Sequence, residues 1–244
     1  MAAKFYPVGI QTFSEIITKN YLYVDKTDLM FDLANRYRYV FLARPRRFGK
    51  SLLCNTFKAY FQGQKQMFNG LKVMELEKEW TKFPVLHFDM SELKNCTNIQ
   101  SMRNILSDMI ARYEEQFGAV KMIEEEGARF RRLLEHIYSS TGKQVVVLID
   151  EYDVPLAKAN ENGYYDEMVL LIRNLFENGL KTNKSLKFAI LTGCLRVAKE
   201  SIFTGLNNFK IYSITDKSFD ETFGFTDNEV RELLEYYGQE EYYE

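Results

Sequence analysis

Short runs of apolar residues recur along the chain, and each is bounded by polar or turn-forming residues. Most of these runs are apolar at nearly every position instead of alternating with polar residues. That pattern is typical of strands buried on both faces of a sheet. The predicted strands are Tyr39–Ala43, Pro84–Asp89, Gln144–Asp150, Leu186–Thr192 and Phe209–Ile214.

Between these runs the apolar residues recur with helical spacing and leave charged residues on the opposite face. Phe68–Thr81 lacks a clear period, and we interpret it as an irregular or helical insertion. Two short helices near the N-terminus each have a threonine as candidate cap. The predicted helices are Thr12–Thr18, Thr27–Ala34, Ser51–Phe61, Ile99–Phe117, Lys121–Tyr138, Tyr164–Lys181 and, behind the cap candidate Thr226, Asp227–Tyr237.

Short buried strands that alternate with helices predict an α/β fold, with helices on both faces of a parallel sheet. The expected architecture is a three-layer sandwich around a largely parallel five-stranded sheet. Ligands of such sheets bind at the carboxyl ends of the strands. Asp150, Glu151 and Thr192 fall at these ends, and Ser51 follows a loop that leaves another.

The loop after the first strand has the features of a phosphate-binding loop. Its backbone N–H groups can cradle phosphates, Lys50 can reach the β and γ oxygens, and Ser51 can bind Mg²⁺ as a helix begins. The usual pattern is G-x-x-x-x-G-K-[ST], and Arg44 stands where its first glycine belongs. The candidate cofactor-binding residues are Arg44, Pro45, Arg46, Arg47, Phe48, Gly49, Lys50, Ser51 and Leu52.

The two carboxylates after the strand Gln144–Asp150 supply the other half of a nucleoside-triphosphate site. Asp150 can hold the same Mg²⁺ as Ser51, and Glu151 can orient an attacking water. Two further candidate catalytic residues, Thr192 and Arg196, each have two possible roles. Thr192 either senses the γ-phosphate or caps the turn after its strand. Arg196 either neutralises developing charge or lies on a helix surface. The predicted catalytic set consists of Lys50, Glu151, Thr192 and Arg196, and the predicted metal ligands are Ser51 and Asp150.

Composition narrows the class of protein. The chain has 244 residues, 46% hydrophobic and 27% charged, which is typical of a globular protein with a sizeable core. Its formal net charge of −2 gives no global basic field for nucleic acid. The three cysteines lack metal-ligand spacing and fit a reducing compartment. No signal pattern or membrane-length apolar run is present, so we expect a cytoplasmic protein without a membrane partner.

Several strings resemble the AAA-ATPase-like family, which consists mostly of bacterial proteins of the additional-strand P-loop class, akin to STAND and Orc-type ATPases. The resemblance covers nearly the whole chain, and the family's loop accepts arginine at the first-glycine position. The strings are VDKT (Val24–Thr27), RPRRFGKS (Arg44–Ser51), LIDEYDVP (Leu148–Pro155), SIFTGLNN (Ser201–Asn208) and FGFT (Phe223–Thr226).

The resemblance implies a domain organisation. Residues 1–225 correspond to the ATPase domain with an N-terminal helical extension, and residues 226–244 to the start of a helical lid that is cut short. Family members continue into a C-terminal domain similar to PD-(D/E)XK nucleases. We therefore expect a lid helix with little chain to pack against and an exposed apolar face made by Val230, Leu233, Leu234 and Tyr237.

The predicted function is an ATP·Mg²⁺-dependent ATPase module that serves as a switch or motor for an attached effector domain. In this interpretation Tyr23 and Val24 neighbour the adenine. Two alternatives remain: a non-catalytic nucleotide-binding scaffold, and an NTPase stimulated by DNA. The partners expected are the nucleotide and the effector domain, with DNA and a second copy of the chain left open.

Overall fold

The apolar runs form a parallel β-sheet at the centre of the molecule. The computed structural model describes residues 4–121, 124–194, 210–212 and 224–243. The strands β2 (Val85–Asp89), β3 (Val145–Asp150), β4 (Leu186–Gly193) and β1 (Tyr39–Ala43) lie in that order, and all neighbours pair in parallel. The predicted parallel α/β sheet is confirmed for these four strands.

A short segment, β5 (Lys210–Tyr212), is hydrogen-bonded in parallel beside β1 at the outer edge of the sheet. It is the described part of the predicted strand Phe209–Ile214. The strand order places β4 between the strand that leads into the phosphate loop and the strand that ends in Asp150. The ends of β1, β4 and β3 are therefore consecutive along one edge.

Burial on both faces explains the continuous apolar runs. Every residue of β1 and of β3 is buried. Because side chains alternate between the faces of a strand, Val146 and Leu148 join the core cluster that contains Phe57. Their neighbours Val147 and Ile149 join the opposite cluster, which contains Phe130.

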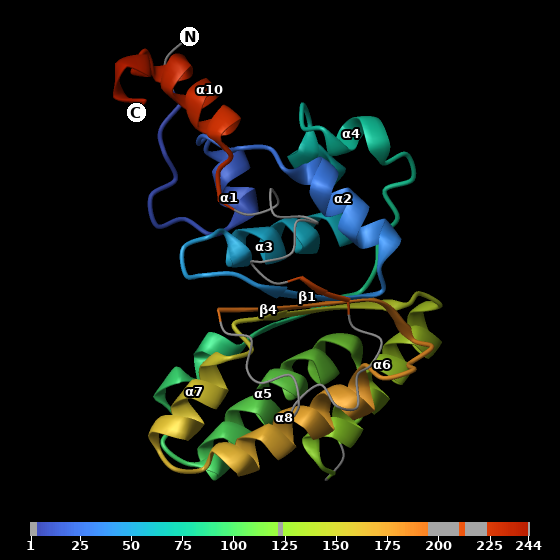
Figure 1. Cartoon of the computed structure of the whole chain (residues 1–244). Coiled ribbons are helices and arrows are strands. Elements are labelled where there is room, and N and C mark those ends of the chain that lie inside the picture. Colours follow the sequence, from blue (N-terminus) through green and yellow to red (C-terminus); the bar gives the residue numbers. More distant parts are fainter. Residues whose placement is uncertain (1–3, 122–123, 195–209, 213–223, 244) are drawn as a thin grey trace.

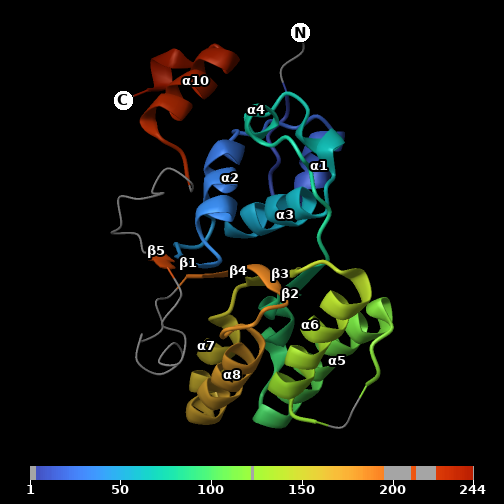
Figure 2. The same cartoon turned by 90° about the vertical axis from the view of Figure 1, so that its right-hand side faces the viewer.

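Helices cover both faces of the sheet, which gives the three layers seen in Figures 1 and 2. One layer holds α1 (Phe13–Thr18), α2 (Thr27–Arg36), α3 (Lys50–Phe61) and α4 (Val73–Leu76), with the short 3-10 helix η1 (Lys65–Phe68). The other holds α5 (Ile99–Phe117), α6 (Glu126–Thr141), α7 (Val154–Glu161) and α8 (Tyr165–Gly179). Beside these layers, η2 (Met90–Asn95) follows β2, while α10 (Asp227–Tyr237) and η4 (Glu240–Tyr242) end the described chain.

One predicted helix start and one predicted helix cap are wrong. The helix predicted from Lys121 begins at Glu126 as α6. The cap assigned to Thr27 is supplied by Asp25, whose Oδ1 accepts hydrogen bonds from the backbone N–H and the hydroxyl of Thr27 at 2.9 and 2.7 Å. By contrast, Thr226 forms the predicted cap of α10, as part of a reciprocal capping box with Glu229.

The helix α10 has a packing partner that the sequence did not suggest. Its apolar residues are half-buried because the N-terminal segment lies against them. Tyr6 stacks on Tyr237 at 4.7 Å between ring centroids, and the Tyr237 hydroxyl donates to the Lys4 carbonyl at 2.5 Å. Leu233 faces a pocket shared with Tyr6. The expectation of a bare apolar face is therefore wrong.

A buried ion pair joins α5 to α6. Two nitrogens of Arg129 donate to the two carboxylate oxygens of Glu114, at 3.1 and 2.5 Å, and a third donates to Ser107. The two charged side chains are 5% and 6% exposed. Each charge therefore depends on the other for its compensation, since neither can be hydrated well.

We expect Arg129→Met to lower the free energy of unfolding by about 3–5 kcal/mol, because it leaves the Glu114 carboxylate buried and unpaired. Urea titration followed by circular dichroism measures this change. The double variant Arg129→Met/Glu114→Leu removes both charges and should recover most of the loss. A double variant as unstable as the single one would contradict this account.

Candidate functional site

The loop between β1 and α3 has the backbone of an anion-binding turn. Gly49 precedes α3 with φ +77°, and a side chain at this position would meet no atom within 4 Å. Arg47 is also left-handed, with φ +67°. The helix that follows directs its first N–H groups and the positive end of its dipole toward this loop. The loop is therefore suited to phosphate.

Lys50, the first residue of α3, is only 6% exposed. Its ammonium donates to the Pro45 carbonyl at 2.9 Å and contacts the Cys194 sulfur at 3.4 Å. Among the described residues no carboxylate lies within ion-pair distance of it. A buried ammonium with only neutral acceptors gains more from an approaching anion than an exposed or paired lysine does.

Asp150, at the end of β3, is held by its neighbours. The Thr192 hydroxyl, at the end of β4, donates to Asp150 Oδ1, and the Glu151 N–H donates to the same oxygen at 3.1 Å. Both of these hydrogen bonds fall on Oδ1, so they do not occupy Oδ2. The structure thus brings together Asp150 and Thr192, two residues that the sequence selected 42 positions apart.

Glu151 adopts an unusual backbone conformation for a non-glycine residue, with φ +54°. Such strain persists only where the surroundings fix it, and it is concentrated at functional sites. Burial raises the pKa of the Glu151 carboxyl, and the negative charges of Asp150 and Asp89 raise it further. Glu151 is therefore a better proton acceptor than an ordinary surface glutamate.

Three polar residues near these strand ends were not selected from the sequence. Asp89 ends β2 and lies beside Asp150 in the parallel register. Asp153 accepts a hydrogen bond from the Cys194 N–H at 3.0 Å, and so ties the turn after β3 to the end of β4. Asp89 could have been found by the rule that selected Asp150, since it too ends a buried strand. Cys194 has no comparable signal.

The arginines of the loop do not form one cluster. Arg44 is 3% exposed, its N–H donates to the Gly193 carbonyl at 3.0 Å, and its guanidinium donates to the Ala43 carbonyl at 3.0 Å. Arg44 therefore helps to join the ends of β1 and β4. Arg46 is exposed, and Arg47 is exposed but also lines the apolar pocket beside the loop. Arg196 lies outside the described residues.

An apolar pocket of about 300 Å³ opens beside the phosphate loop. It is lined by the two predicted adenine neighbours, Tyr23 and Val24, and by Phe48, Gly49 and Leu52 from the loop and α3. Burial raises the pKa of the Tyr23 hydroxyl. Leu233 from α10 and Phe225 complete the wall. A flat, largely apolar group attached to a phosphate in the loop would fit here.

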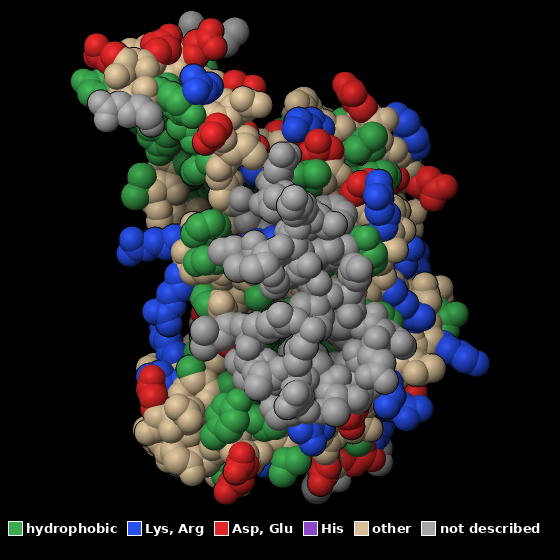
Figure 3. All heavy atoms as spheres, viewed as in Figure 1, with side chains coloured by type: hydrophobic (Ala, Val, Ile, Leu, Met, Phe, Trp, Pro, Cys, Tyr) green, Lys and Arg blue, Asp and Glu red, His purple; other side chains and the backbone are tan. Residues whose placement is uncertain are grey.

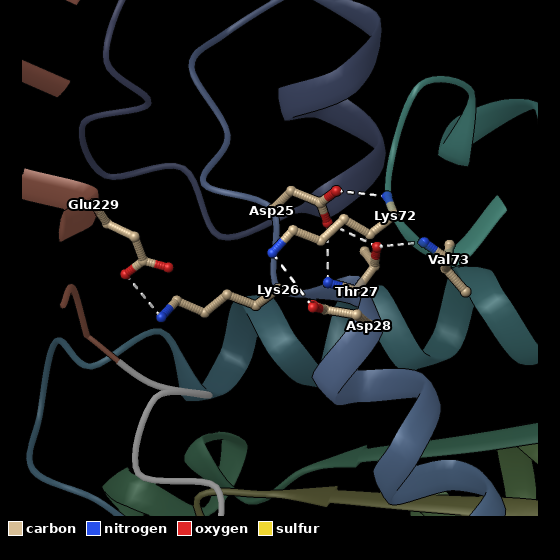
Figure 4. A network of polar contacts seen from close by, with 7 residues as sticks. All are labelled: Asp25, Lys26, Thr27, Asp28, Lys72, Val73 and Glu229. Carbon is tan, nitrogen blue, oxygen red and sulfur yellow. Dashed lines mark hydrogen bonds and ion pairs between the residues drawn. The ribbon is translucent and has the colours of Figure 1, made fainter. Parts of the chain in front are cut away.

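Lys26, which lines this pocket, belongs to the network of polar contacts in Figure 4. Asp25 accepts from the backbone N–H of Lys72 at 2.7 Å, and Thr27 accepts from that of Val73 at 3.1 Å, so α2 is anchored to α4. Between them in the sequence, Lys26 pairs with Glu229 of α10 at 3.0 Å. The pocket is therefore built from both ends of the described chain.

The residues present fit ATP and Mg²⁺. Gly49 leaves open space where a Cβ would stand, and Lys50 is buried without a carboxylate partner among the described residues. Both features suit the binding of a triphosphate. Ser51 carries a hydroxyl and Asp150 a carboxylate, and hard oxygens of this kind are the ligands that Mg²⁺ prefers. The described residues contain no group of three or more His, Cys, Asp or Glu that could hold a metal ion by itself.

The parallel sheet, the phosphate loop and the carboxylate-ended strand define a P-loop-like α/β domain. Comparison with known sequences identifies the family: the chain belongs to the predicted AAA-ATPase family, whose profile matches residues 7–203. This membership indicates a nucleotide-binding ATPase. A relative from Azotobacter chroococcum mcd 1, described as an uncharacterized protein in the vnfD 5' region, is 33% identical over 233 residues. The match covers 94% of this chain and 45% of the relative.

Within the ranges that the structure describes, no helix is both long and apolar enough to span a membrane.

Proposed function

We propose that the chain binds ATP with Mg²⁺ and hydrolyses it at the carboxyl edge of the sheet. One observation carries the proposal. The buried ammonium of Lys50, which has no carboxylate partner among the described residues, contacts Cys194. Cys194 lies two residues after Thr192, whose hydroxyl donates to Asp150. Lys50, the proposed phosphate-binding cation, and Asp150, the proposed metal ligand, thus each contact a residue at the end of the same strand, β4.

Each residue has a role in transfer to water, a reaction that needs positioning and charge neutralisation more than covalent chemistry. The Lys50 ammonium exchanges its neutral partners for β- and γ-phosphate oxygens. Ser51 and Asp150 would hold Mg²⁺, and the bound ion would supply positive charge to the phosphates. Glu151 orients the attacking water and accepts its proton, as its raised pKa favours. Thr192 holds Asp150 in place through its hydroxyl, and from the end of β4 it would report on the γ-phosphate.

The apolar pocket between Tyr23, Val24 and Phe48 would hold the base. Its position against Gly49 supports this, since a base must lie within one ribose of the phosphates. The placement of β4 between β1 and β3 supports assignment to the additional-strand class. The length of the relative beyond the matched segment supports a further domain that ATP turnover would drive, as a switch or motor. A PD-(D/E)XK nuclease-like domain is the effector that the resemblance implies.

The test compares ATP affinity, by calorimetry with and without Mg²⁺, with steady-state phosphate release from the same preparation. We expect Mg²⁺-dependent binding and measurable phosphate release. Binding without release would favour a non-catalytic scaffold. Binding that Mg²⁺ leaves unchanged would contradict the metal site at Ser51 and Asp150.

A further inference from the structure

The amino edge of the sheet, opposite the nucleotide site, carries a row of cations. A parallel sheet gathers its strand-entering segments at one edge. For β1 to β4 these segments, with the first two residues of β4 included, are residues 36–38, 81–84, 142–144 and 180–187. These four segments contain, in that order, two, one, one and three Lys or Arg and no Asp or Glu. A chain with net charge −2 thus concentrates positive charge at one edge. Figure 3 shows Lys and Arg side chains along the right-hand side of the molecule.

Most of this charge is available to a partner. Lys82, Lys143 and Lys184 are exposed, and none of them forms an ion pair within the described ranges. They precede β2, β3 and β4, which are adjacent in the sheet. With β1 included, the row crosses four strands and is roughly 14 Å long at the usual strand spacing. That length allows contact with more than one phosphate of a nucleic-acid strand.

An aromatic hollow of about 390 Å³ adjoins the row. Lys187 belongs to both, because it enters β4 and lies over the Phe83 ring at 5.7 Å. The hollow is also lined by Phe31, Tyr60 and Trp80. Trp80 is 9% exposed, and its indole N–H is buried without a hydrogen-bond partner among the described residues. A buried donor without an acceptor is costly unless a ligand supplies one.

The charges on the rim of the hollow are mixed, so they do not extend the cation row. The Glu77 carboxylate is engaged by the Tyr60 hydroxyl at 2.5 Å and by the N–H groups of Glu79 and Trp80. The Lys78 and Glu79 side chains are exposed beside it. The hollow itself is therefore suited to a neutral aromatic group that carries an acceptor, and phosphates belong on the lysine row.

We propose that this amino-edge surface, consisting of Lys82, Lys143, Lys184, Lys187 and the hollow around Trp80, binds single-stranded nucleic acid. The lysines track the phosphate backbone, and an unpaired base enters the hollow, stacks on its rings and accepts from the Trp80 N–H. The bases of a duplex are stacked inside the helix and cannot enter. An acidic peptide would use the lysines but has no aromatic group to fill the hollow.

Fluorescence anisotropy with a labelled oligothymidylate, titrated at several salt concentrations, tests this surface. Lys82→Glu/Lys143→Glu/Lys184→Glu should weaken binding about tenfold or more and lower the salt slope by about 2, since each lost phosphate contact removes about 0.7. The matched control, Lys65→Glu/Lys94→Glu/Lys121→Glu, makes the same charge change at exposed lysines elsewhere and should bind as the native chain does.

Trp80→Phe separates base recognition from charge. It keeps an aromatic ring but removes the N–H donor, and it should weaken binding about fivefold while leaving the salt slope unchanged. ATP affinity and thermal stability, measured on every variant, check that the fold is intact. Equal affinity of the two triple variants, or no binding by the native chain, would overturn the proposal. The proposal would also be overturned if duplex DNA or polyglutamate competed as strongly as unlabelled oligothymidylate. The surface would then recognise negative charge without recognising an unpaired base.

Discussion

Replacing Lys50 by alanine should weaken ATP binding about 100-fold and leave the fold intact. The estimate follows from losing one or two charge-assisted contacts to phosphate, each of about 1.5–3 kcal/mol. The fold should tolerate the change because the ammonium, which is 6% exposed, has only the Pro45 carbonyl and the Cys194 sulfur as partners. No carboxylate is left unpaired when it is removed. Calorimetric titration with ATP·Mg²⁺ measures the affinity.

Lys58→Ala is the matched control, since it makes the same substitution two turns further along α3. It should bind ATP as the native chain does, because Lys58 lies away from the loop. Thermal denaturation of both variants separates a binding defect from unfolding. Equal ATP affinity of Lys50→Ala and the native chain would remove the basis for a phosphate site in this loop.

The sequence predicted the sheet because the physical cause of each strand is local. A strand buried on both faces must be apolar at almost every position, and that pattern is legible in β1, β3 and β4. The same holds for the placement of Asp150 and Thr192, since parallel strands end at one edge. The hydrogen bond between these two residues needed the three-dimensional strand order, which brings β4 between β3 and β1.

Other features depend on contacts between distant segments and have no local signal. The helix α7 starts directly after the turn at Asp153 and is only eight residues long, so its periodicity was too short to read. Asp25 accepts from the first N–H of α2 with one carboxylate oxygen and from the backbone N–H of the distant Lys72 with the other. The packing of α10 on the N-terminal segment joins Tyr237 to Tyr6, residues from opposite ends of the chain. No window of sequence contains both partners.

Replacing Glu151 by glutamine should keep ATP affinity within about twofold and slow hydrolysis about 100-fold or more, the usual range for a lost general base. Glutamine has nearly the same shape and can occupy the same backbone conformation, but it cannot accept a proton from water. Single-turnover phosphate release measures the chemical step separately from binding. Glu167→Gln, at an exposed position in the first turn of α8, makes the same change away from the site and should leave the rate unaltered.

The same variant should also be more stable than the native chain at neutral pH. The pKa of Glu151 is raised in the folded state, so its ionised form opposes folding, chiefly through burial and the nearby charges of Asp150 and Asp89. As pH rises through that raised pKa, the native chain loses stability that the glutamine variant keeps. Below the ordinary glutamate pKa of about 4.3 the carboxyl is protonated in both folded and unfolded chains, so the difference should vanish. Native hydrolysis should decline over the same range on acidification, because the protonated carboxyl no longer accepts a proton. Melting temperatures of the two chains across pH measure the effect, and a difference independent of pH would show that the Glu151 charge is not its cause.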